Sequence, residues 1–301
     1  MRRCYHIGSL SQLKDLRDFD IVQFTASGHI FPSKRRIAEA LLGITDYFNC
    51  RVIVHMDFVW IASRFALLTT SVKAAVAEEL AEIINNVTAH ELPVDGIVMH
   101  TDFPIQQKVW NDVSLLETRY KSACYDLSAI RKFVEKGEES YLFDCSFKEL
   151  YAEVKSRSTK TPTVKICLEN STKILNGCEN PTNTVPGLLS YLESNSYMKD
   201  LFGIAIDTEH DAAITKEVLR VPPEGVTVLY HLNTIPPEAP IGKGIDRHSS
   251  TTVFECSERK FEEYDNFSKM LDSKNIPWVR EIHEDAYLRE LKQIDGVCQI
   301  L

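Results

Sequence analysis

Short apolar runs, spaced along the whole chain, are the sequence feature that most restricts the fold. Each run has apolar residues at consecutive positions rather than at alternating ones, as a parallel strand buried on both faces requires. Eight runs have this character: CYHIGSL (4–10), IVQFTA (21–26), RVIVHM (51–56), GIVMH (96–100), VKICLEN (164–170), FGIAIDT (202–208), VTVLYHL (226–232) and IPWVREI (276–282). They predict eight buried parallel strands.

Segments with helical periodicity separate these runs. They cover residues 71–87, 115–136, 184–194, 258–273 and 285–294, and the long connection 101–163 is expected to carry two helices. Alternating strands and helices indicate βα units in one parallel sheet, and eight units favour a closed (β/α)8 TIM barrel over an open doubly wound sheet. No glycine-rich nucleotide-binding motif follows any strand. We therefore predict an α/β protein with a single barrel domain over residues 1–301.

Composition excludes several classes of protein. The chain is 44% hydrophobic and 26% charged, which is typical of a globular protein and not of a disordered one. No apolar run approaches the roughly 20 residues of a membrane span, and the N-terminus lacks the apolar core of a signal peptide. An intracellular protein without a membrane partner is expected. The net charge of −9 argues against binding nucleic acid through bulk positive charge.

The cysteines contain no C-x-x-C pair, and several lie inside apolar runs. The eight are Cys4, Cys50, Cys124, Cys145, Cys167, Cys178, Cys256 and Cys298. This scattered pattern favours reduced thiols in the core over disulfides or thiolate-bound zinc.

Polar residues gather where the apolar runs end. The C-terminal ends of barrel strands converge on one mouth, so residues far apart in the sequence become neighbours there. The candidate metal ligands at these positions are His55, His100, Glu169, Asp207, His210, His231, Asp246, His248 and Glu281. Imidazoles and carboxylates without a thiolate suit zinc or manganese. Nine ligands exceed the needs of one tetrahedral ion and fit two or three ions that share a bridging carboxylate.

The joint placement of these residues carries the metal hypothesis. A single histidine at a strand end is more often a hydrogen-bonded rim residue, and a carboxylate there is often a helix cap. His6, His29, His90 and His283 lack the placement or the partners, so we assign them no chemistry.

Seven short strings, taken in order along the chain, resemble the endonuclease IV family of zinc-dependent apurinic/apyrimidinic endonucleases. They are VIVHMDF, IVMHTDFP, CLENSTK, IAIDTEH, YHLNT, GIDRH and WVREI. The resemblance runs from about residue 4 to about residue 294. It implies a (β/α)8 barrel with about three zinc ions. The first would be held by His55, His100 and Glu169, the second by Glu169, Asp207, His231 and Glu281, and the third by His210, Asp246 and His248.

The resemblance also implies a reaction in DNA repair. The phosphodiester 5′ to an abasic site in duplex DNA would be hydrolysed, leaving a 3′-hydroxyl and a 5′-deoxyribose phosphate. Glu169 would bridge two ions and Glu281 would orient or help deprotonate the attacking water, which makes these two the predicted catalytic residues. Zinc is the expected ion and manganese the alternative. Three divalent ions against four ligand carboxylates would leave the mouth cationic despite the negative net charge.

The loops expected to contact DNA depart from the family. Phe58 stands at the position of the aromatic wedge and Val59 follows it, where the family commonly has tyrosine and leucine. Arg247 and the basic segment SKRR (33–36) are the predicted phosphate contacts. The loop ASGHIF (26–31) and the segment SSTTVFEC after the third-ion ligands also differ. Such divergence suits a viral or otherwise fast-evolving member of the family. We separately expect a monomer inside the cell, in the cytoplasm or nucleus, or at a viral replication site or in the virion if the protein is viral.

Two other functions remain open at the level of the sequence. A xylose-isomerase-like sugar isomerase or epimerase needs about four carboxylate and histidine ligands around one or two ions, which leaves His210, Asp246 and His248 without a role. A catalytically inactive DNA-binding relative would explain the divergent loops, although it would not need Glu169 and Glu281.

Overall fold

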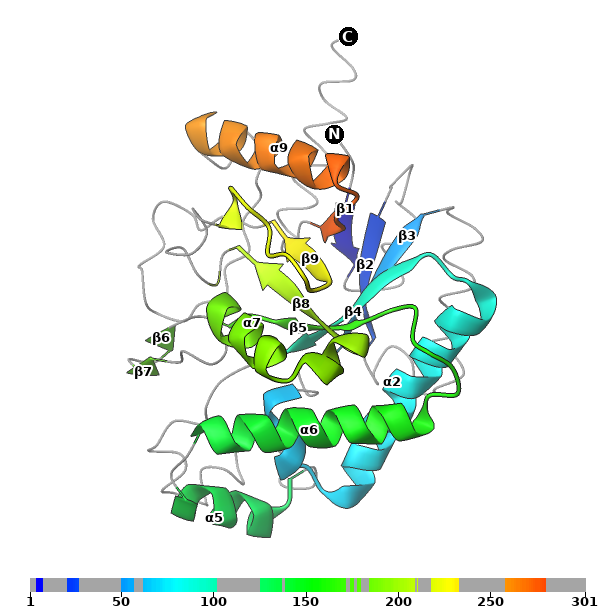
Figure 1. Ribbon diagram of the computed structural model, residues 1–301, viewed down its shortest axis with the longest axis vertical. Coiled ribbons are helices and arrows are strands. Elements are labelled where there is room, and N and C mark those ends of the chain that lie inside the picture. Colours follow the sequence, from blue (N-terminus) through cyan, green and yellow to red (C-terminus); the bar gives the residue numbers. More distant parts are fainter. Residues whose placement is uncertain are drawn as a thin grey trace.

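An eight-stranded parallel sheet forms the centre of the molecule (Figure 1). The computed structural model describes residues 4–7, 21–26, 50–56, 62–101, 125–136, 139–171, 174–175, 178–179, 184–208, 210, 218–232 and 258–279. The strands, in their order across the sheet, are β1 (Cys4–Ile7), β2 (Ile21–Ala26), β3 (Arg51–Met56), β4 (Val94–His100), β5 (Ile166–Glu169), β8 (Phe202–Asp207), β9 (Val228–His231) and β10 (Trp278–Val279). Every neighbouring pair in this sheet is parallel.

All eight predicted strands are confirmed, in sequence order. Continuous burial along β3, β5, β8 and β9 explains why their sequences are apolar at consecutive positions, because each strand is covered on both faces. A second, two-stranded antiparallel sheet of β6 (Ile174–Leu175) and β7 (Cys178–Glu179) was not predicted. Each of its strands is too short to leave a periodic signal.

The main sheet curls strongly toward closure. Gln23 on β2 lies 2.9 Å from His231 on β9, measured from Oε1 to Nε2. Five strand steps separate β2 from β9, which in a flat sheet would place them roughly 24 Å apart. The first and last strands, β1 and β10, also contact each other, although no hydrogen-bonded pairing joins them among the described residues. The fold is therefore α/β and TIM-barrel-like.

Helices surround the curled sheet (Figure 1). They are η2 (Ala62–Leu67), α2 (Thr70–His90), α5 (Leu127–Lys136), α6 (Glu139–Arg157), α7 (Val185–Ser194), η4 (Ser196–Asp200) and α9 (Glu258–Ser273). Helix α5 contacts η2 and lies on the far side of α6 from the sheet. The predicted helices at 71–87, 184–194 and 258–273 are confirmed, and two helices, α5 and α6, lie within 101–163 as expected. The helix predicted at 115–136 is shorter than expected, because α5 begins only at Leu127 and Tyr125 forms a β-bridge with Leu68. Residues 115–124 and 285–294 lie outside the described parts. Within those parts, none of the helices combines the length and apolar character that crossing a bilayer needs.

Helix boundaries follow local chemistry. Helix α2 ends at Glu91, which adopts a left-handed conformation with φ of 49° and donates its backbone N–H to Val87. Helix α7 begins after Thr184, whose hydroxyl accepts the backbone N–H of Gly187, and Pro186 occupies the first turn. These caps satisfy polar groups at the ends of helices that pack on the sheet.

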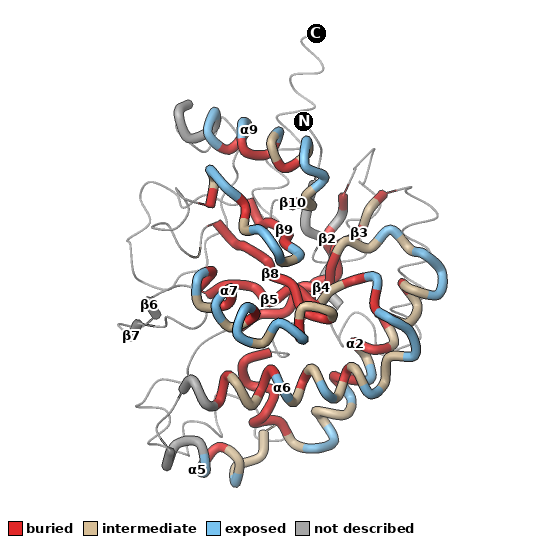
Figure 2. The backbone as a smooth tube through the Cα atoms, in the orientation of Figure 1, coloured by how far each residue is buried: buried red, intermediate tan, exposed pale blue. Residues whose placement is uncertain are grey.

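Side chains fill the interior of the curled sheet. Figure 2 shows the central strands as the most buried part of the backbone. An added Cβ at Gly96 on β4 would lie 2.7 Å from Leu229 on β9 and 3.1 Å from Cys167 on β5. A side chain at position 96 would therefore force the end of Leu229 to move. The described interior is closely packed at this level, below the strand ends.

Candidate metal centre

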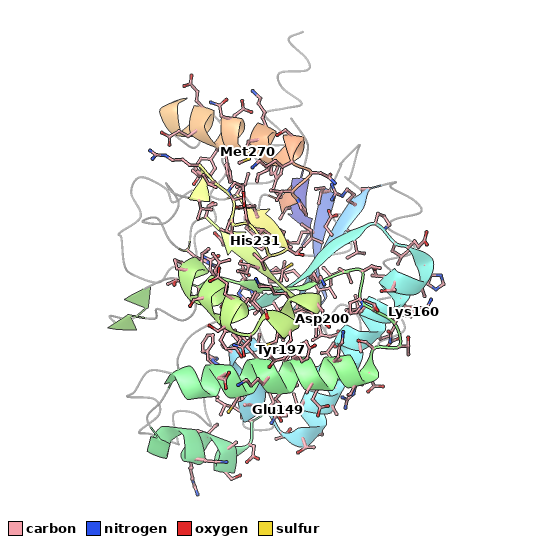
Figure 3. The ribbon with its side chains drawn as sticks, viewed as in Figure 1. Glu149, Lys160, Tyr197, Asp200, His231 and Met270 are labelled. Carbon is pink, nitrogen blue, oxygen red and sulfur yellow. The ribbon has the colours of Figure 1, made fainter. Side chains whose placement is uncertain are left out.

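Strand register places the predicted ligands in one layer at the C-terminal ends of the strands. His100 on β4 is the direct partner of Glu169 on β5, and Asp207 on β8 is the direct partner of His231 on β9. His55 occupies the penultimate position of β3. Because side chains two residues apart share a face, these residues all point to the interior side of the sheet. Figure 3 shows His231 near the middle of the molecule, between Glu149 on α6 and Met270 on α9.

Glu169 lies at the centre of this layer and is only 1% exposed. Its Oε2 lies 3.4 Å from His55 Nε2 and 3.4 Å from His100 Nδ1. Its Oε1 lies 2.9 Å from His231 Nδ1. One carboxylate thus faces imidazoles through both of its oxygens.

The electrostatics of Glu169 reflect these neighbours. Burial by itself would raise the pKa of the carboxyl, because the charged form loses water. Attraction to His100 and His231, with hydrogen bonds from His231 and His55, outweighs burial and holds the pKa well below its usual range. The site therefore stabilises a buried anion and is suited to cations.

A second group of ligands adjoins the first. Asp207 Oδ2 lies 3.9 Å from His231 Nδ1 and 3.9 Å from His210 Nε2. Two sets of donor atoms each gather within 4.8 Å: His55, His100 and Glu169 form one, and Glu169, Asp207 and His210 form the other. Glu169 belongs to both sets, as a bridging carboxylate must.

In three of the imidazoles, the ring nitrogen that faces away from the Glu169 and Asp207 carboxylates, here called the outer nitrogen, lies beside an oxygen acceptor. The other ring nitrogen is called the inner nitrogen. His55 Nδ1 lies 2.8 Å from the carbonyl oxygen of Met56, and His210 Nδ1 lies 2.7 Å from that of Asn170. His231 Nε2 lies 2.9 Å from Gln23 Oε1. A carbonyl oxygen only accepts, so each outer nitrogen carries a proton, and the inner nitrogen, which faces a carboxylate oxygen here, is the one that would lose its own proton to bind a metal ion.

This arrangement fits bound metal ions. A neutral imidazole of this tautomer would turn its lone pair toward a carboxylate oxygen, which is repulsive unless a cation lies between them. Donor atoms on one tetrahedral ion with bonds of about 2.0–2.1 Å lie about 3.3–3.4 Å apart. The separations of 3.4 Å from Glu169 Oε2 to His55 and His100 match that spacing. The donor set, buried nitrogen and oxygen without sulfur, suits zinc or manganese.

Asn170, next to Glu169, positions two of the ligands. Its Oδ1 accepts the backbone N–H of Asp207 at 2.7 Å, and its Nδ2 donates to the carbonyl oxygen of Asp207 at 3.1 Å. Its own carbonyl oxygen contacts His210. Thr101 donates its hydroxyl to the carbonyl oxygen of Glu169. These contacts restrict the orientation of the ligands, as the outer partners of metal ligands do in general.

The structure brings together six of the nine predicted ligands: His55, His100, Glu169, Asp207, His210 and His231. Asp246, His248 and Glu281 lie outside the described residues, as do the predicted DNA contacts Phe58, Val59 and Arg247 and the segment 33–36. Asp246 and His248, which were predicted to hold a third ion with His210, are therefore not described. Among the described residues, His210 groups with Glu169 and Asp207.

Sequence reasoning missed Gln23 and the role of Asn170. Gln23 interrupts the apolar run IVQFTA, and a polar residue inside a strand buried on both faces is itself a signal. Asn170 directly follows a predicted ligand, but nothing in the sequence shows that its amide contacts a strand 37 residues later.

Comparisons with known proteins bear on the fold. No protein-family model matches the chain, and no curated protein matches its sequence. The chain is similar to the solved structure of a D-tagatose 3-epimerase-like protein, with 18% identity, a TM-score of 0.53, and coverage of 99% of this chain and 97% of that one. For a xylose isomerase domain protein from Planctomyces limnophilus, the identity is 14%, the TM-score 0.55 and the coverage 99% and 95%.

The AsfvAP:AG structure is also similar, with 16% identity, a TM-score of 0.51, and coverage of 93% of this chain and 86% of that one. At such low identity these likenesses concern the fold alone. They support a TIM-barrel-like fold over nearly the whole chain.

Proposed function

We propose that this protein is a metal-dependent phosphodiesterase that cuts duplex DNA on the 5′ side of an abasic site. The observation that carries the proposal is the double use of Glu169. Its Oε2 faces His55 and His100, and its Oε1 faces His231 beside Asp207. A carboxylate shared by two ligand sets supports two adjacent ions, the arrangement by which metal sites clamp the attacking and leaving oxygens of a phosphodiester.

The ligand count favours this reaction over a sugar isomerase that uses a single ion. An isomerase site with one ion would be supplied by Glu169, Asp207 and neighbouring groups. It would give no role to His55 and His100, two buried imidazoles that form a separate set around the other carboxylate oxygen. Two ligand sets that share Glu169 argue for a second ion.

We assign each of these residues a role in metal binding, catalysis or DNA contact. His55, His100, Asp207, His210 and His231 would hold the ions, and Glu169 would fix their separation. Divalent ions bound there would lower the pKa of a water molecule and neutralise charge on the phosphate. Glu281 is proposed to orient the attacking water, Phe58 with Val59 to wedge the duplex, and Arg247 to contact a phosphate. A missing base lowers the cost of turning the nucleotide out of the helix toward the mouth.

Charge is compatible with this partner. The net charge of −9 counts no metal ion. Two or three divalent ions at the mouth would oppose the ligand carboxylates and make this one surface attractive to phosphate. Acidic residues elsewhere can face away from the DNA.

The test is incision of a duplex that carries one abasic analogue, by zinc- or manganese-loaded protein. We expect a single cut 5′ to the lesion, none in the undamaged duplex, and loss of cutting after chelation. Glu169→Gln removes the bridging charge and should reduce the rate at least 100-fold, by analogy with the loss of other key electrostatic groups. Glu149→Gln on α6, paired with Lys73 outside the site, is the control and should cut normally.

Two other outcomes identify the alternatives. Interconversion of ketose sugars by the metal-loaded protein, without incision, would establish the isomerase, which the fold and the Glu169–Asp207 group both allow. Tight, metal-dependent binding of the abasic duplex without incision would establish an inactive DNA-binding relative.

A further inference from the structure

We propose that Gln23 is a positioning residue of the metal centre, which holds His231 in the tautomer and ring orientation that a metal ion requires. Its Oε1 lies 2.9 Å from His231 Nε2, on the far side of the ring from Glu169. Both side chains have an exposed fraction of 0%. The inference rests on the proposed metal site but not on the reaction carried out there.

Gln23 is a polar side chain in an apolar part of the interior, where packing alone would favour an apolar residue. Its strand partner is Ile53, and Ile53 lies two positions before His55 on the same face. Gln23 therefore belongs to the interior layer directly beneath the ligands, where the corresponding residues on other strands include Ile53, Val98, Ala205 and Leu229. A buried amide in an apolar layer is costly unless it is hydrogen-bonded.

The contact determines which nitrogen of His231 faces the ions. With Gln23 Oε1 as acceptor, Nε2 keeps its proton, so Nδ1 is the ring nitrogen that would give up its proton and bind a metal ion. Nδ1 is the nitrogen that lies 2.9 Å from Glu169 and 3.9 Å from Asp207. Without Gln23, the proton would be stabilised on Nδ1 by the Glu169 carboxylate, and the metal would have to compete for that position.

Gln23 also differs in kind from the other outer partners. His55 and His210 are each held by a backbone carbonyl, which every residue type supplies. His231 is held by a side chain from a strand on the other side of the interior, so its orientation depends on the residue type at position 23. A substitution at position 23 can therefore remove this contact.

Zinc affinity of the full-length chain, measured by competition with a chromophoric chelator, tests the proposal. Gln23→Met keeps the length and removes the acceptor, and should weaken the binding of at least one zinc ion 10- to 100-fold, the usual effect of losing an outer partner. Gln23→Glu restores an oxygen acceptor and should remain within about threefold of wild type, as carboxylate partners of ligating histidines do.

Ser146→Ala is the matched control, because it removes a buried hydrogen bond between α6 and η2 without touching a ligand. It should leave zinc affinity unchanged. Equal affinities in wild type and a folded Gln23→Met variant would overturn the proposal.

The tautomer itself is the second readout and needs only wild-type protein. Two-bond ¹H–¹⁵N correlation spectra of the zinc-loaded chain, assigned with a His231→Gln variant, should show His231 protonated at Nε2 and bound to zinc through Nδ1. Zinc bound through Nε2 would overturn the proposal even if Gln23→Met fails to fold. Neither readout uses DNA, so a protein that binds zinc but does not cut abasic DNA would refute the proposed function and leave this inference standing.

Discussion

At the scale of single residues, neighbouring positions have different tasks. Glu169 offers two oxygens to the ligand cluster, whereas Asn170 holds the backbone of Asp207 through both ends of its amide. A backbone segment held in this way keeps Asp207 in place whether or not an ion is bound. Positioning and ligation are thus separable by mutation.

We predict that Asn170→Asp lowers the free energy of unfolding of the zinc-free protein by about 1–3 kcal/mol, the cost of leaving a buried acceptor unsatisfied. The new carboxylate oxygen would face the carbonyl oxygen of Asp207, and zinc affinity should also fall. Urea unfolding and zinc titration measure the two effects. Asn85→Asp is the control, since Asn85 makes the same kind of double contact, to Thr159 N and Arg157 O, away from the site. Unchanged zinc affinity in Asn170→Asp would contradict a positioning role.

Thiol chemistry gives a second prediction at this scale. Cys50 is buried, and burial raises the pKa of its thiol above the usual value, while Cys145 is partly exposed. The thiolate is the form that reacts with alkylating agents. At pH 8 iodoacetamide should therefore modify Cys145 much faster than Cys50 in the native protein, and both at similar rates in urea, as followed by peptide mass spectrometry. Equal native rates would show that Cys50 is accessible.

The grouping of the candidate ligands was predictable because their positions share a simple rule. His55, His100, Glu169, Asp207 and His231 all fall at or next to the last residue of a strand, and parallel strands end at one mouth. Gln23 was not predictable in this way, since it lies in the middle of its strand and contacts a residue 208 positions away. Only the curvature of the sheet brings those two side chains together.

At the scale of elements, the strands were easier to predict than the helices. A strand buried on both faces needs apolar residues at consecutive positions, and this pattern identified all eight strands. Helix α6 has a buried stripe at Phe143, Phe147, Leu150 and Val154. Because Ser146 interrupts this stripe, a helix was predicted here without bounds. The β6–β7 pair was missed because two-residue strands carry no period.

The stripe on α6 leads to a prediction of stability. Phe147 is fully buried, with its ring centroid 4.9 Å from Phe143, 5.2 Å from Tyr191 on α7 and 6.3 Å from Phe202 on β8. Phe147→Ala should lower the free energy of unfolding by about 3–5 kcal/mol through the cavity it leaves. The adjacent exposed Lys148→Ala should change it by about 0.5 kcal/mol or less. Urea unfolding measures both, and similar values for the two would mean that α6 does not pack as described.

At the scale of the whole molecule, the curl of the sheet is what assembles the site. His55 and His231 lie four strand steps apart in the sheet order, yet their ring centroids are 5.9 Å apart. The cluster contains buried imidazoles and carboxylates from five different strands, so binding of an ion there links those strands in the folded state only.

Metal removal should therefore destabilise the whole fold. A ligand at 100 times its dissociation constant stabilises the folded state by about 2.7 kcal/mol per site. We predict that chelation lowers the Tm measured by calorimetry, that added zinc restores it, and that Glu169→Gln responds much less to either treatment. A Tm that does not depend on metal would contradict a site that spans the barrel.

The most direct test of the central claim is the number of ions bound per chain. The apo protein is loaded with zinc or manganese, freed of excess metal by gel filtration, and analysed by plasma mass spectrometry against protein concentration. The two ligand groups that share Glu169 predict at least two ions per chain, and fewer in Glu169→Gln. One ion or none in the wild-type protein would contradict the claim that this carboxylate bridges a metal cluster.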